Sequence, residues 1–256
     1  MSYIVSVANQ KGGVAKTTST HNIGVALAKK GYTVLLVDLD SQASLTFSVG
    51  IDPLAVEDKN IVTVLTAKNT IPIEECIYKV RTVENLYIIP SIIDLAQIEL
   101  EMFARSSREK ILERALGPIK NSYDFILIDC PPQLSVLTIN ALSCCDGVII
   151  PVKTDELAYR GLTQLENTIE EIKELINSKL EILGIVATMF EKISIEDKKV
   201  LTKLEQKEHV IGIIKKTVEV KKGISKGTSI VEDQVTNEVS IVYQNIADKI
   251  IKREEG

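Results

Sequence analysis

Two lysines, a pair of glycines and a pair of threonines stand close together near the start of the chain. The segment Tyr3–Thr18, YIVSVANQKGGVAKTT, begins as an apolar β-type run and then places Gly12, Gly13 and Lys16 before Thr17. Glycines let backbone N–H groups turn toward an anion, and the helix expected to begin at Thr17 adds the partial positive charge of its N-terminus. A lysine there can reach phosphate, and a threonine hydroxyl can bind Mg²⁺. The pattern predicts a nucleotide triphosphate site; a strand-to-helix turn with a solvated lysine is the alternative.

The loop departs from the phosphate-loop pattern G-x-x-x-x-G-K-[ST] at both glycines. Gln10 stands at the first and Ala15 at the second, and a further lysine, Lys11, opens the loop. A methyl group crowds a turn where backbone must approach phosphate, which glycine avoids. Ala15 is tolerable if its backbone is helical, whereas a positive φ would reduce ATP affinity or hydrolysis. The sequence leaves both possibilities open.

Three aspartates follow apolar segments that are predicted to be strands. Asp38 and Asp40 come at the end of one run, and Asp129 ends another. Alternation along a strand places Asp38 and Asp40 on the same side, at the sheet edge where α/β folds bind ligands. Asp129 is positioned to hold the shell of a Mg²⁺ ion. Pro131 and Pro132 make the next loop stiff, which suits a switch that responds to phosphate. Acids that merely solvate a loop are the alternative.

These motifs resemble those of the ParA family of DNA-partition ATPases, in the wider group that includes MinD and the nitrogenase iron protein. The segments KGGVAKTT, LLVDLDSQ (35–42) and FILIDCPP (125–132) match its three nucleotide-site motifs, although the family pattern KGGVGKTT has glycine at Ala15. The family also has Pro-Gln-Gly where residues 41–43 are Ser-Gln-Ala, which implies a differently shaped loop. The resemblance spans essentially the whole chain and implies ATP or ADP with Mg²⁺ as cofactors.

The resemblance also implies a role for individual residues. Lys11 is expected to cross a dimer interface to the partner's nucleotide, Lys16 to neutralise phosphate, and Asp40 to position the attacking water. The expected metal set is Thr17 with Asp38 and Asp129 in the outer shell. The expected nucleotide contacts are Lys11, Gly12, Gly13, Val14, Ala15, Lys16, Thr17, Thr18, Asp129, Pro131, Thr188 and Met189. Thr188 and Met189 are neighbours of the adenine in this reading, and core residues in the alternative one.

A basic stretch near the C-terminus is the candidate DNA contact. The net charge of −5 argues against a globally basic nucleic-acid binder, so a local patch is needed. Five lysines lie between residues 215 and 226, with only Glu219 opposing them. They are Lys215, Lys216, Lys221, Lys222 and Lys226. In the family the matching region is a loop that grips DNA phosphates without reading sequence; a solvated charge run is the alternative.

The remaining pattern predicts an α/β fold. At 256 residues, with 45% hydrophobic and 25% charged residues, the chain suits one large domain, 1–256. Apolar runs separated by helices predict a doubly wound, mostly parallel sheet of about seven strands, as in P-loop NTPases. Helices are expected at 17–30, from 91 or 94 to about 116, at 134–143, 157–177 and 236–252, with helical candidates at 61–67 and 73–78.

No apolar run approaches the roughly 20 residues of a membrane span, and the N-terminus lacks a signal pattern. Four cysteines without C-x-x-C spacing indicate structural thiols. The expected location is cytoplasmic and nucleoid-associated. We therefore expect an ATP-driven switch for plasmid or chromosome partition, with Mg-ATP-driven homodimerisation, nonspecific DNA binding and slow hydrolysis stimulated by a ParB-like adaptor. The alternatives are a MinD-like membrane-associated positioning ATPase, which would use the tail 243–256, and a nucleotide sensor whose hydrolysis is impaired by Ala15.

Overall fold

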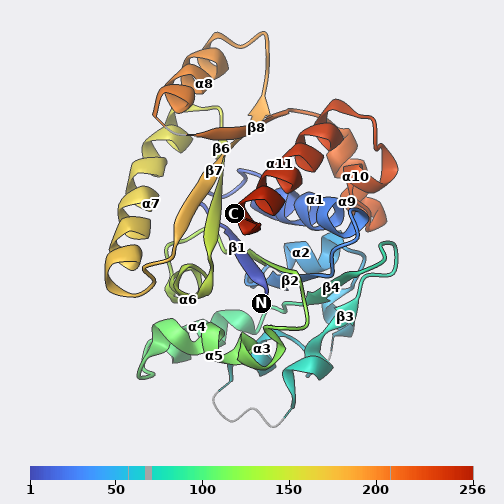
Figure 1. Ribbon diagram of the computed structural model, residues 1–256, viewed down its shortest axis with the longest axis vertical. Helices are drawn as coiled ribbons and strands as arrows, with labels where there is room; N and C mark the ends of the chain where they lie inside the picture. Colours follow the sequence, from blue (N-terminus) through green and yellow to red (C-terminus); the bar gives the residue numbers. More distant parts are fainter. Residues whose placement is uncertain (57, 67–70, 208, 256) are drawn as a thin grey trace.

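One mixed sheet forms the centre of the protein (Figure 1). The computed structural model describes residues 1–256 except 57, 67–70, 208 and 256, and leaves out the side chain of Lys221. Within the described residues eight strands lie in the order β3-β4-β2-β5-β1-β6-β7-β8. Every neighbouring pair is parallel except β3 with β4. The strands are β1 (Tyr3–Val7), β2 (Val34–Asp38), β3 (Tyr78–Lys79), β4 (Leu86–Ile89), β5 (Phe125–Asp129), β6 (Gly147–Lys153), β7 (Glu181–Phe190) and β8 (Val210–Lys215).

Helices cover both faces of the sheet (Figure 1). One face packs against helices α3 to α8, and the other against α1, α2, α10 and α11. The helices are α1 (Lys16–Lys29), α2 (Ser44–Ser48), α3 (Ile61–Leu65), α4 (Leu95–Met102), α5 (Ile111–Leu116), α6 (Val136–Cys144), α7 (Glu156–Leu175), α8 (Ile195–Lys207), α9 (Glu219–Lys226), α10 (Ile230–Asp233) and α11 (Glu238–Glu254). Successive strand residues alternate between the two cores, Ile4 in one and Val5 in the other, which is why the strands read as continuous apolar runs. The doubly wound α/β prediction is confirmed.

Two local predictions were wrong. The segment 73–78, expected to be helical, is a 3₁₀ turn at Ile73–Cys76 followed by the two-residue edge strand β3, which accounts for the eighth strand. The single helix expected up to residue 116 is divided into α4 and α5, with Ser107 at a φ of 50° between them. Tertiary contacts fix this break, because the Asn140 side chain accepts from Leu112 N–H and donates to the Arg108 carbonyl. Helix α8 had no counterpart among the expected elements.

The C-terminal helix α11 docks on the protein. Its apolar residues Tyr243, Ile246, Ala247 and Ile250 are buried against the core that includes α1. The Tyr243 hydroxyl lies 3.4 Å from the Ser19 hydroxyl on α1. Docking against the core, expected over a membrane contact, is therefore what this helix does. Among the described residues no helix combines the length and the apolarity that a bilayer crossing requires.

His21 is buried in α1 without a hydrogen-bond partner for its Nε2 atom among the described residues. Its side chain is 2% exposed, and burial lowers its pKa from 6.5 to about 4. The Glu232 carboxylate, 3.9 Å away, would favour protonation, but it accepts the Ser229 N–H of a helix-capping box. Burial therefore dominates, and the folded protein holds His21 neutral.

We expect His21 to weaken the fold in mild acid. Below pH 6.5 the unfolded chain takes up a proton that the folded protein accepts only near pH 4, so the free energy of unfolding falls across this window, by about 3 kcal/mol in total. Other buried groups titrate in the same range, so the informative quantity is the difference between proteins. We measure the free energy of unfolding by urea at pH 7 and at pH 5. From pH 7 to pH 5 the His21→Gln variant should lose less stability than the parent. The control variant His209→Gln, at an exposed position, should lose as much stability as the parent. Equal losses for all three would contradict this account.

Candidate functional site

The loop between β1 and α1 is held in place at its start. The Asn9 side chain donates to the Pro151 carbonyl (2.7 Å) and accepts the Lys11 N–H (2.9 Å). The Gln10 side chain donates to the Gly161 carbonyl of α7 (2.7 Å). Gln10, which occupies the first glycine position of the phosphate-loop pattern, thus ties the loop to a neighbouring helix.

A cleft of about 490 Å³ opens where the loop meets α1. It brings together most of the loop residues that the sequence singled out, with Asp40 from the loop after β2. The lining residues are Gly12, Gly13, Ala15, Lys16, Thr17, Thr18, Asp40, Gln42, Ser44, Phe47, Pro132, Met189 and Ile224. Five of the expected nucleotide contacts are not among these lining residues: Lys11, Val14, Asp129, Pro131 and Thr188. Val14 is 1% exposed, and Pro131 is buried while its neighbour Pro132 lines the cleft. An alternating loop turns neighbouring prolines in opposite directions, and the sequence does not say which one faces the ligand.

Lys16 is a buried cation at the floor of this cleft. Its side chain is 7% exposed, and its Nζ donates to the Lys11 carbonyl at 3.1 Å. Burial lowers its pKa, and the negative charge of Asp129 opposes that shift. A buried ammonium group that faces a cleft is stabilised by an anion with several acceptor oxygens, such as phosphate.

Asp129 lies behind Thr17 at the end of β5. Its carboxylate accepts the Thr17 hydroxyl at 2.6 Å and the Thr20 hydroxyl at 3.2 Å. Burial raises its pKa to about 8, with Asp38 adding to the shift, while the Thr17 hydrogen bond and Lys16 oppose it. Asp129 therefore fixes the orientation of the hydroxyl of Thr17, a residue that lines the cleft.

Asp38 anchors the loop that carries Asp40. It is fully buried and lies beside Asp129, because β2 and β5 pair in that register. Its carboxylate accepts both the N–H (2.8 Å) and the hydroxyl (2.7 Å) of Thr46 and the N–H of Asp40 (3.1 Å). Burial raises the pKa of Asp38 to about 6, although these hydrogen bonds oppose it. Asp40 itself is partly exposed and lines the cleft.

The donor set fits Mg²⁺ rather than a metal held by protein ligands alone. Among the described residues no group of three or more histidine, cysteine or acidic side chains is arranged to hold a metal ion. Side-chain oxygens at the cleft come from Thr17, whose hydroxyl donates to Asp129, and from other lining residues such as Asp40. Mg²⁺ suits such a site because it keeps several waters and takes further oxygens from phosphate.

The sequence left open whether the backbone of Ala15 is helical or has a positive φ, and in the structure its φ is positive. Its φ is 67° and its ψ is 33°, in the left-handed region that L-residues other than glycine seldom adopt. Ala43 shows the same geometry (φ 51°), also where the family has glycine. Both positions carry strain of about 1–2 kcal/mol each by the usual cost of this region.

Lys11 does not line the cleft of its own chain. Its Nζ forms an ion pair with Asp155 at 2.9 Å, and Lys153 pairs with the same carboxylate at 3.0 Å. Asp155 also caps α7 by accepting the Ala158 N–H at 2.8 Å. Burial alone would raise the pKa of Asp155, but the hydrogen bonds, led by that of Lys11, hold it at about 2. In this structure Lys11 is therefore held away from the loop's own ligand position.

A smaller apolar pocket of about 280 Å³ adjoins the cleft. Apolar side chains, among them Met189, Val220 and Ile224, make up part of its lining. The lining residues are Ala15, Thr18, Thr188, Met189, Ile214, Lys215, Lys216, Thr217, Val220, Ile224 and Tyr243. Thr188 and Met189, the residues expected beside the adenine, both line this pocket, and the Thr188 hydroxyl donates to the Val14 carbonyl at 3.1 Å. Sequence reasoning missed Val220 and Ile224, although the alternation of apolar and lysine residues in α9 marks one apolar helix face.

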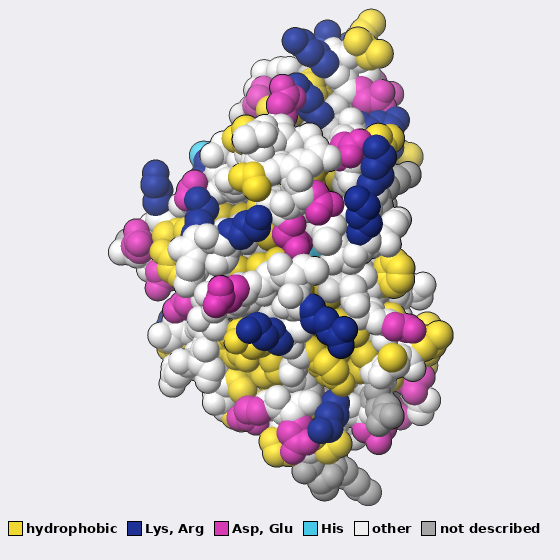
Figure 2. Space-filling model, turned by 90° about the vertical axis from the view of Figure 1, so that its right-hand side faces the viewer, with side chains coloured by type: hydrophobic (Ala, Val, Ile, Leu, Met, Phe, Trp, Pro, Cys, Tyr) yellow, Lys and Arg dark blue, Asp and Glu magenta, His cyan; other side chains and the backbone are white. Residues whose placement is uncertain are grey.

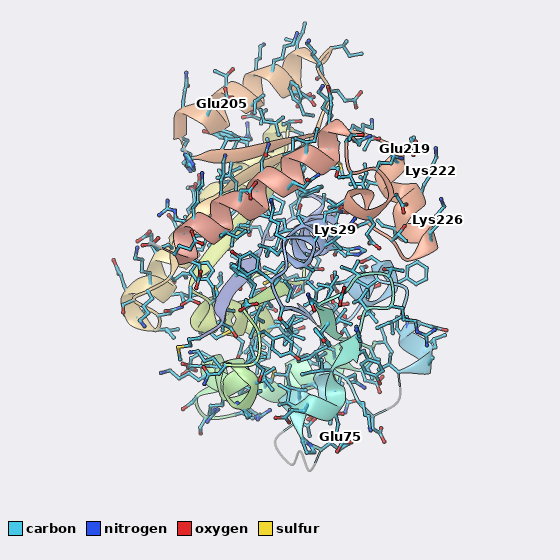
Figure 3. All side chains as sticks on the ribbon, turned by 45° about the vertical axis from the view of Figure 1, so that its right-hand side comes forward. Lys29, Glu75, Glu205, Glu219, Lys222 and Lys226 are labelled. Atoms are coloured by element: carbon cyan, nitrogen blue, oxygen red, sulfur yellow. The ribbon has the colours of Figure 1, made fainter. Side chains whose placement is uncertain are left out.

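The basic stretch is not one loop: Lys215 ends β8, Lys216 lies between β8 and α9, and the remaining lysines lie on the helix α9. Three lysines of the stretch are paired: Lys215 with Glu238 (2.5 Å), Lys216 with Glu191 (2.6 Å) and Lys222 with Glu219 (2.7 Å). Lys221 has a side chain outside those that the structure describes. Figure 3 shows Lys222 and Lys226 on the outer side of α9. Because exposed ion pairs contribute little stability, a polyanion can compete for these lysines.

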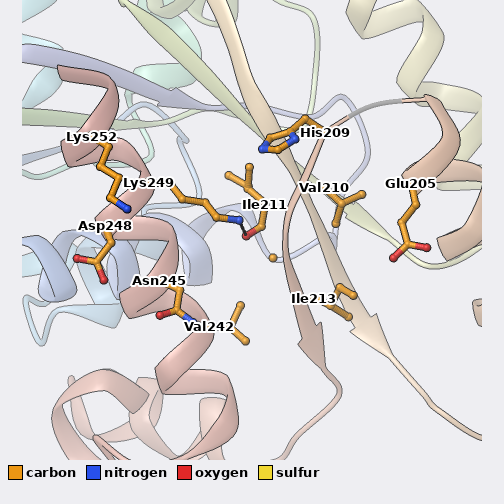
Figure 4. A pocket seen from close by; sticks show the side chains of 11 residues that line it. Glu205, His209, Val210, Ile211, Ile213, Val242, Asn245, Asp248, Lys249 and Lys252 are labelled. Atoms are coloured by element: carbon orange, nitrogen blue, oxygen red, sulfur yellow. Dashed lines mark hydrogen bonds between the residues drawn. The ribbon is translucent and has the colours of Figure 1, made fainter. Parts of the chain in front are cut away.

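A larger cavity lies elsewhere, between β8 and α11, with a volume of about 820 Å³ (Figure 4). Acidic and basic side chains are mixed in it, including Glu205, Asp248 and Lys252. Lys249 crosses it to donate to the Ile211 carbonyl at 2.9 Å, which covers part of the sheet edge. Neither the glycine loop nor the buried acids reach this cavity, so we place the chemistry in the smaller cleft.

Known sequences resemble this chain over most of its length. A family model described as an AAA domain matches residues 2–182. The sporulation initiation inhibitor protein Soj of Bacillus subtilis is 44% identical over 191 residues, which cover 75% of this chain and 74% of that protein. The chromosome-partitioning ATPase Soj of Treponema pallidum is 34% identical over 249 residues and 96% of both chains. Two uncharacterised Mycobacterium tuberculosis proteins are 39% identical over 204 residues, and the match spans 63% of their length.

Solved structures show the same fold. Cobyrinic acid a,c-diamide synthase from Mycobacterium smegmatis, with an ATP analogue and magnesium, has a TM-score of 0.85 at 32% identity, covering 100% of this chain and 97% of that one. A putative plasmid partition protein from Borrelia burgdorferi bound to AMPPNP has a TM-score of 0.83 at 29% identity, covering 99% and 100%. The predicted cofactors, ATP or ADP with Mg²⁺, are those bound in such relatives. The glycine loop, the parallel strands and these matches together show that the chain belongs to the ParA/Soj family of P-loop partition ATPases.

Proposed function

We propose that this protein is a Mg-ATP-driven switch in plasmid or chromosome partition. In this proposal ATP favours a homodimer that binds DNA without sequence preference, and a ParB-like adaptor stimulates slow hydrolysis that releases the DNA. The protein would then be cytoplasmic and associated with the nucleoid. The observation that carries the proposal is the buried Lys16 ammonium at the floor of a cleft, beside a Thr17 hydroxyl held by Asp129.

The residues of the cleft divide the chemistry of phosphate hydrolysis among them. Lys16 and the N–H groups at the start of α1 bind and neutralise phosphate oxygens. Thr17 would hold Mg²⁺, with Asp129 and Asp38 in the second layer. When bound, the metal ion screens the charge of the triphosphate. Asp40, partly exposed at the cleft, would accept a hydrogen bond from the attacking water and orient it.

The position of Lys11 supports ATP-dependent dimerisation. Lys11 is outside its own cleft and bound to Asp155, where it is about one-third exposed. The triphosphate of a facing subunit would offer a more strongly charged partner than a single carboxylate. Transfer of Lys11 from Asp155 to that phosphate would couple ATP binding to dimer formation.

The position of α9 supports a link between nucleotide and DNA. Val220 and Ile224 face the pocket expected to hold the base, whereas Lys222 and Lys226 lie on the outer side of the same helix. A nucleotide that fills the pocket contacts α9 directly. The same short helix would therefore contact the nucleotide with one face and present its lysines on the other.

We expect Mg²⁺-dependent ATP binding and an ATP-dependent change in size. Titration with a fluorescent ATP analogue should show affinity that is lost with chelator, and light scattering should show a monomer becoming a dimer. Lys16→Ala should weaken binding by at least roughly tenfold, because a charge-assisted contact of about 1.5–3 kcal/mol is lost. Lys30→Ala, whose lysine pairs with Asp248 outside the cleft, is the matched control. A protein that binds no ATP and keeps one size would refute the proposal.

DNA binding should require ATP and weaken steeply with salt. If Lys216 and Lys222 each neutralise one phosphate, the double Gln variant should reduce the slope of log affinity against log salt by about 1.8 per subunit. Gel shift at two salt concentrations, with and without ATP, measures this. Replacing Lys198 and Lys199, both exposed on α8, removes the same charge as a control. DNA binding that is unaffected both by nucleotide and by the Lys216 and Lys222 replacements would argue against the switch.

Replacing the strained Ala15 by glycine tests whether the protein hydrolyses ATP or only binds it as a sensor. Ala15→Gly should raise the free energy of unfolding by up to about 1 kcal/mol, because relief of the left-handed strain exceeds the added freedom of glycine. It should also speed phosphate release, which a coupled enzyme assay follows. Ala43→Gly relieves similar strain at a buried position outside the cleft lining, and should stabilise without changing release. A parent without any release, active only as Ala15→Gly, would favour the nucleotide sensor.

A further inference from the structure

A second basic site lies at the C-terminal end of α9, in a cleft separate from the nucleotide cleft. A cleft of about 380 Å³ separates the edge strand β3 from the C-terminal end of α9. Lys79, Arg81 and Lys226 line it, with Asp52 as the acid among its described lining residues. We call it the β3–α9 cleft. Its remaining lining residues are Val49, Gly50, Ile51, Ala55, Val56, Tyr78, Thr82 and Gly227.

The cations of this cleft differ from the other lysines near α9. Three lysines near α9 form an ion pair with a glutamate: Lys215, Lys216 and Lys222. By contrast, none of the three cations that line the cleft forms an ion pair with any residue that the structure describes; these are Lys79, Arg81 and Lys226. All three are exposed. Lys226 lies within the electrostatic range of Glu219, whose pKa it helps to lower, but that carboxylate is bonded to Lys222 and Gln234. The described lining of the cleft therefore holds three cations and one acid, in a protein of net charge −5.

We infer that the β3–α9 cleft binds the phosphate backbone of duplex DNA, as an extension of the α9 lysine surface. This inference rests on the proposed function. Lys222 and Lys226 are four residues apart on α9 and share one helix face, so the cations continue from that face into the cleft. Figure 2 shows this side of the molecule, with lysine and arginine side chains spaced across it. Exposed cations contributed by two separate segments suit a line of repeated phosphates better than one enclosed small ligand.

The cleft also touches the nucleotide site through a backbone contact. Gly50, just after α2, packs on Gly227, the residue that ends α9, so closely that a Cβ on Gly227 would stand 2.6 Å from the Gly50 Cα. Ser44 and Phe47 of α2 line the nucleotide cleft. A phosphate in the β3–α9 cleft would thus lie against the same segment that ATP contacts from the other side.

The test removes the new cations without touching α9. Lys79→Gln with Arg81→Gln should weaken ATP-dependent binding of a random-sequence duplex by roughly tenfold per lost contact near 0.1 M salt, and lower the salt slope by about 0.9 for each. Lys179→Gln with Arg253→Gln removes one lysine and one arginine near β7, on the other half of the sheet. This control pair should bind DNA like the parent.

Asp52→Asn provides a test in the opposite direction. Asp52 accepts the Leu54 N–H at the start of a 3₁₀ turn, and asparagine can keep that cap while removing the negative charge. DNA binding should become tighter. ATP affinity should be unchanged in every variant, since none of these residues lines the nucleotide cleft.

The outcomes separate this inference from the proposed function. If the parent binds no DNA with ATP, the proposed function fails. If the parent binds DNA and the Lys79 and Arg81 variant matches it in affinity and salt slope, the cleft assignment alone is overturned. The assignment is also overturned if inorganic phosphate at millimolar concentration removes the difference between the two proteins, because the cleft would then be a site for small anions.

Discussion

The structure depends on keeping opposite charges buried at one edge of a parallel sheet. The register of β2, β5 and β1 sets Asp38 beside Asp129, and the loop from β1 brings Lys16 toward them. Burial shifts the pKa of each of these groups toward its neutral form. A triphosphate and Mg²⁺ would supply the charges that Lys16 and the acids lack. The site is therefore arranged to be completed by its ligand, which is the property a nucleotide switch needs.

Helix α9 connects the two surfaces on which the proposed switch relies. Its sequence alternates so that Val220 and Ile224 turn inward while Lys222 and Lys226 turn outward. The ion pairs around it, such as Lys216 with Glu191, are exposed and contribute little stability, so they can exchange for other partners. A short helix with weak polar contacts and one apolar face against a ligand pocket is well suited to shift when the pocket fills.

The sequence was sufficient for the fold and for the local part of the site. Lys16, Thr17 and Asp129 could be predicted because each lies at a fixed offset from an apolar strand, and strand order brings such ends together. The remaining features depend on tertiary contacts between distant segments. Ile224 and Phe47 line the cleft only because α2 and α9 pack against each other, and Asp155 captures Lys11 only because α7 begins beside the loop. Likewise, the break between α4 and α5 depends on Asn140, which lies on another helix.

The contact between Gly50 and Gly227 has a consequence for how sequences of this kind can vary. Both residues adopt a positive φ, at 83° and 71°, and Gly50 occupies the space that a side chain on Gly227 would need. Two segments that are 177 positions apart in the sequence are thus constrained together. A larger residue at Gly227 cannot be accommodated by a smaller residue at position 50, because Gly50 has no side chain to lose. Among natural variants, the contact between Gly50 and Gly227 should tolerate fewer substitutions than the charged surface around it.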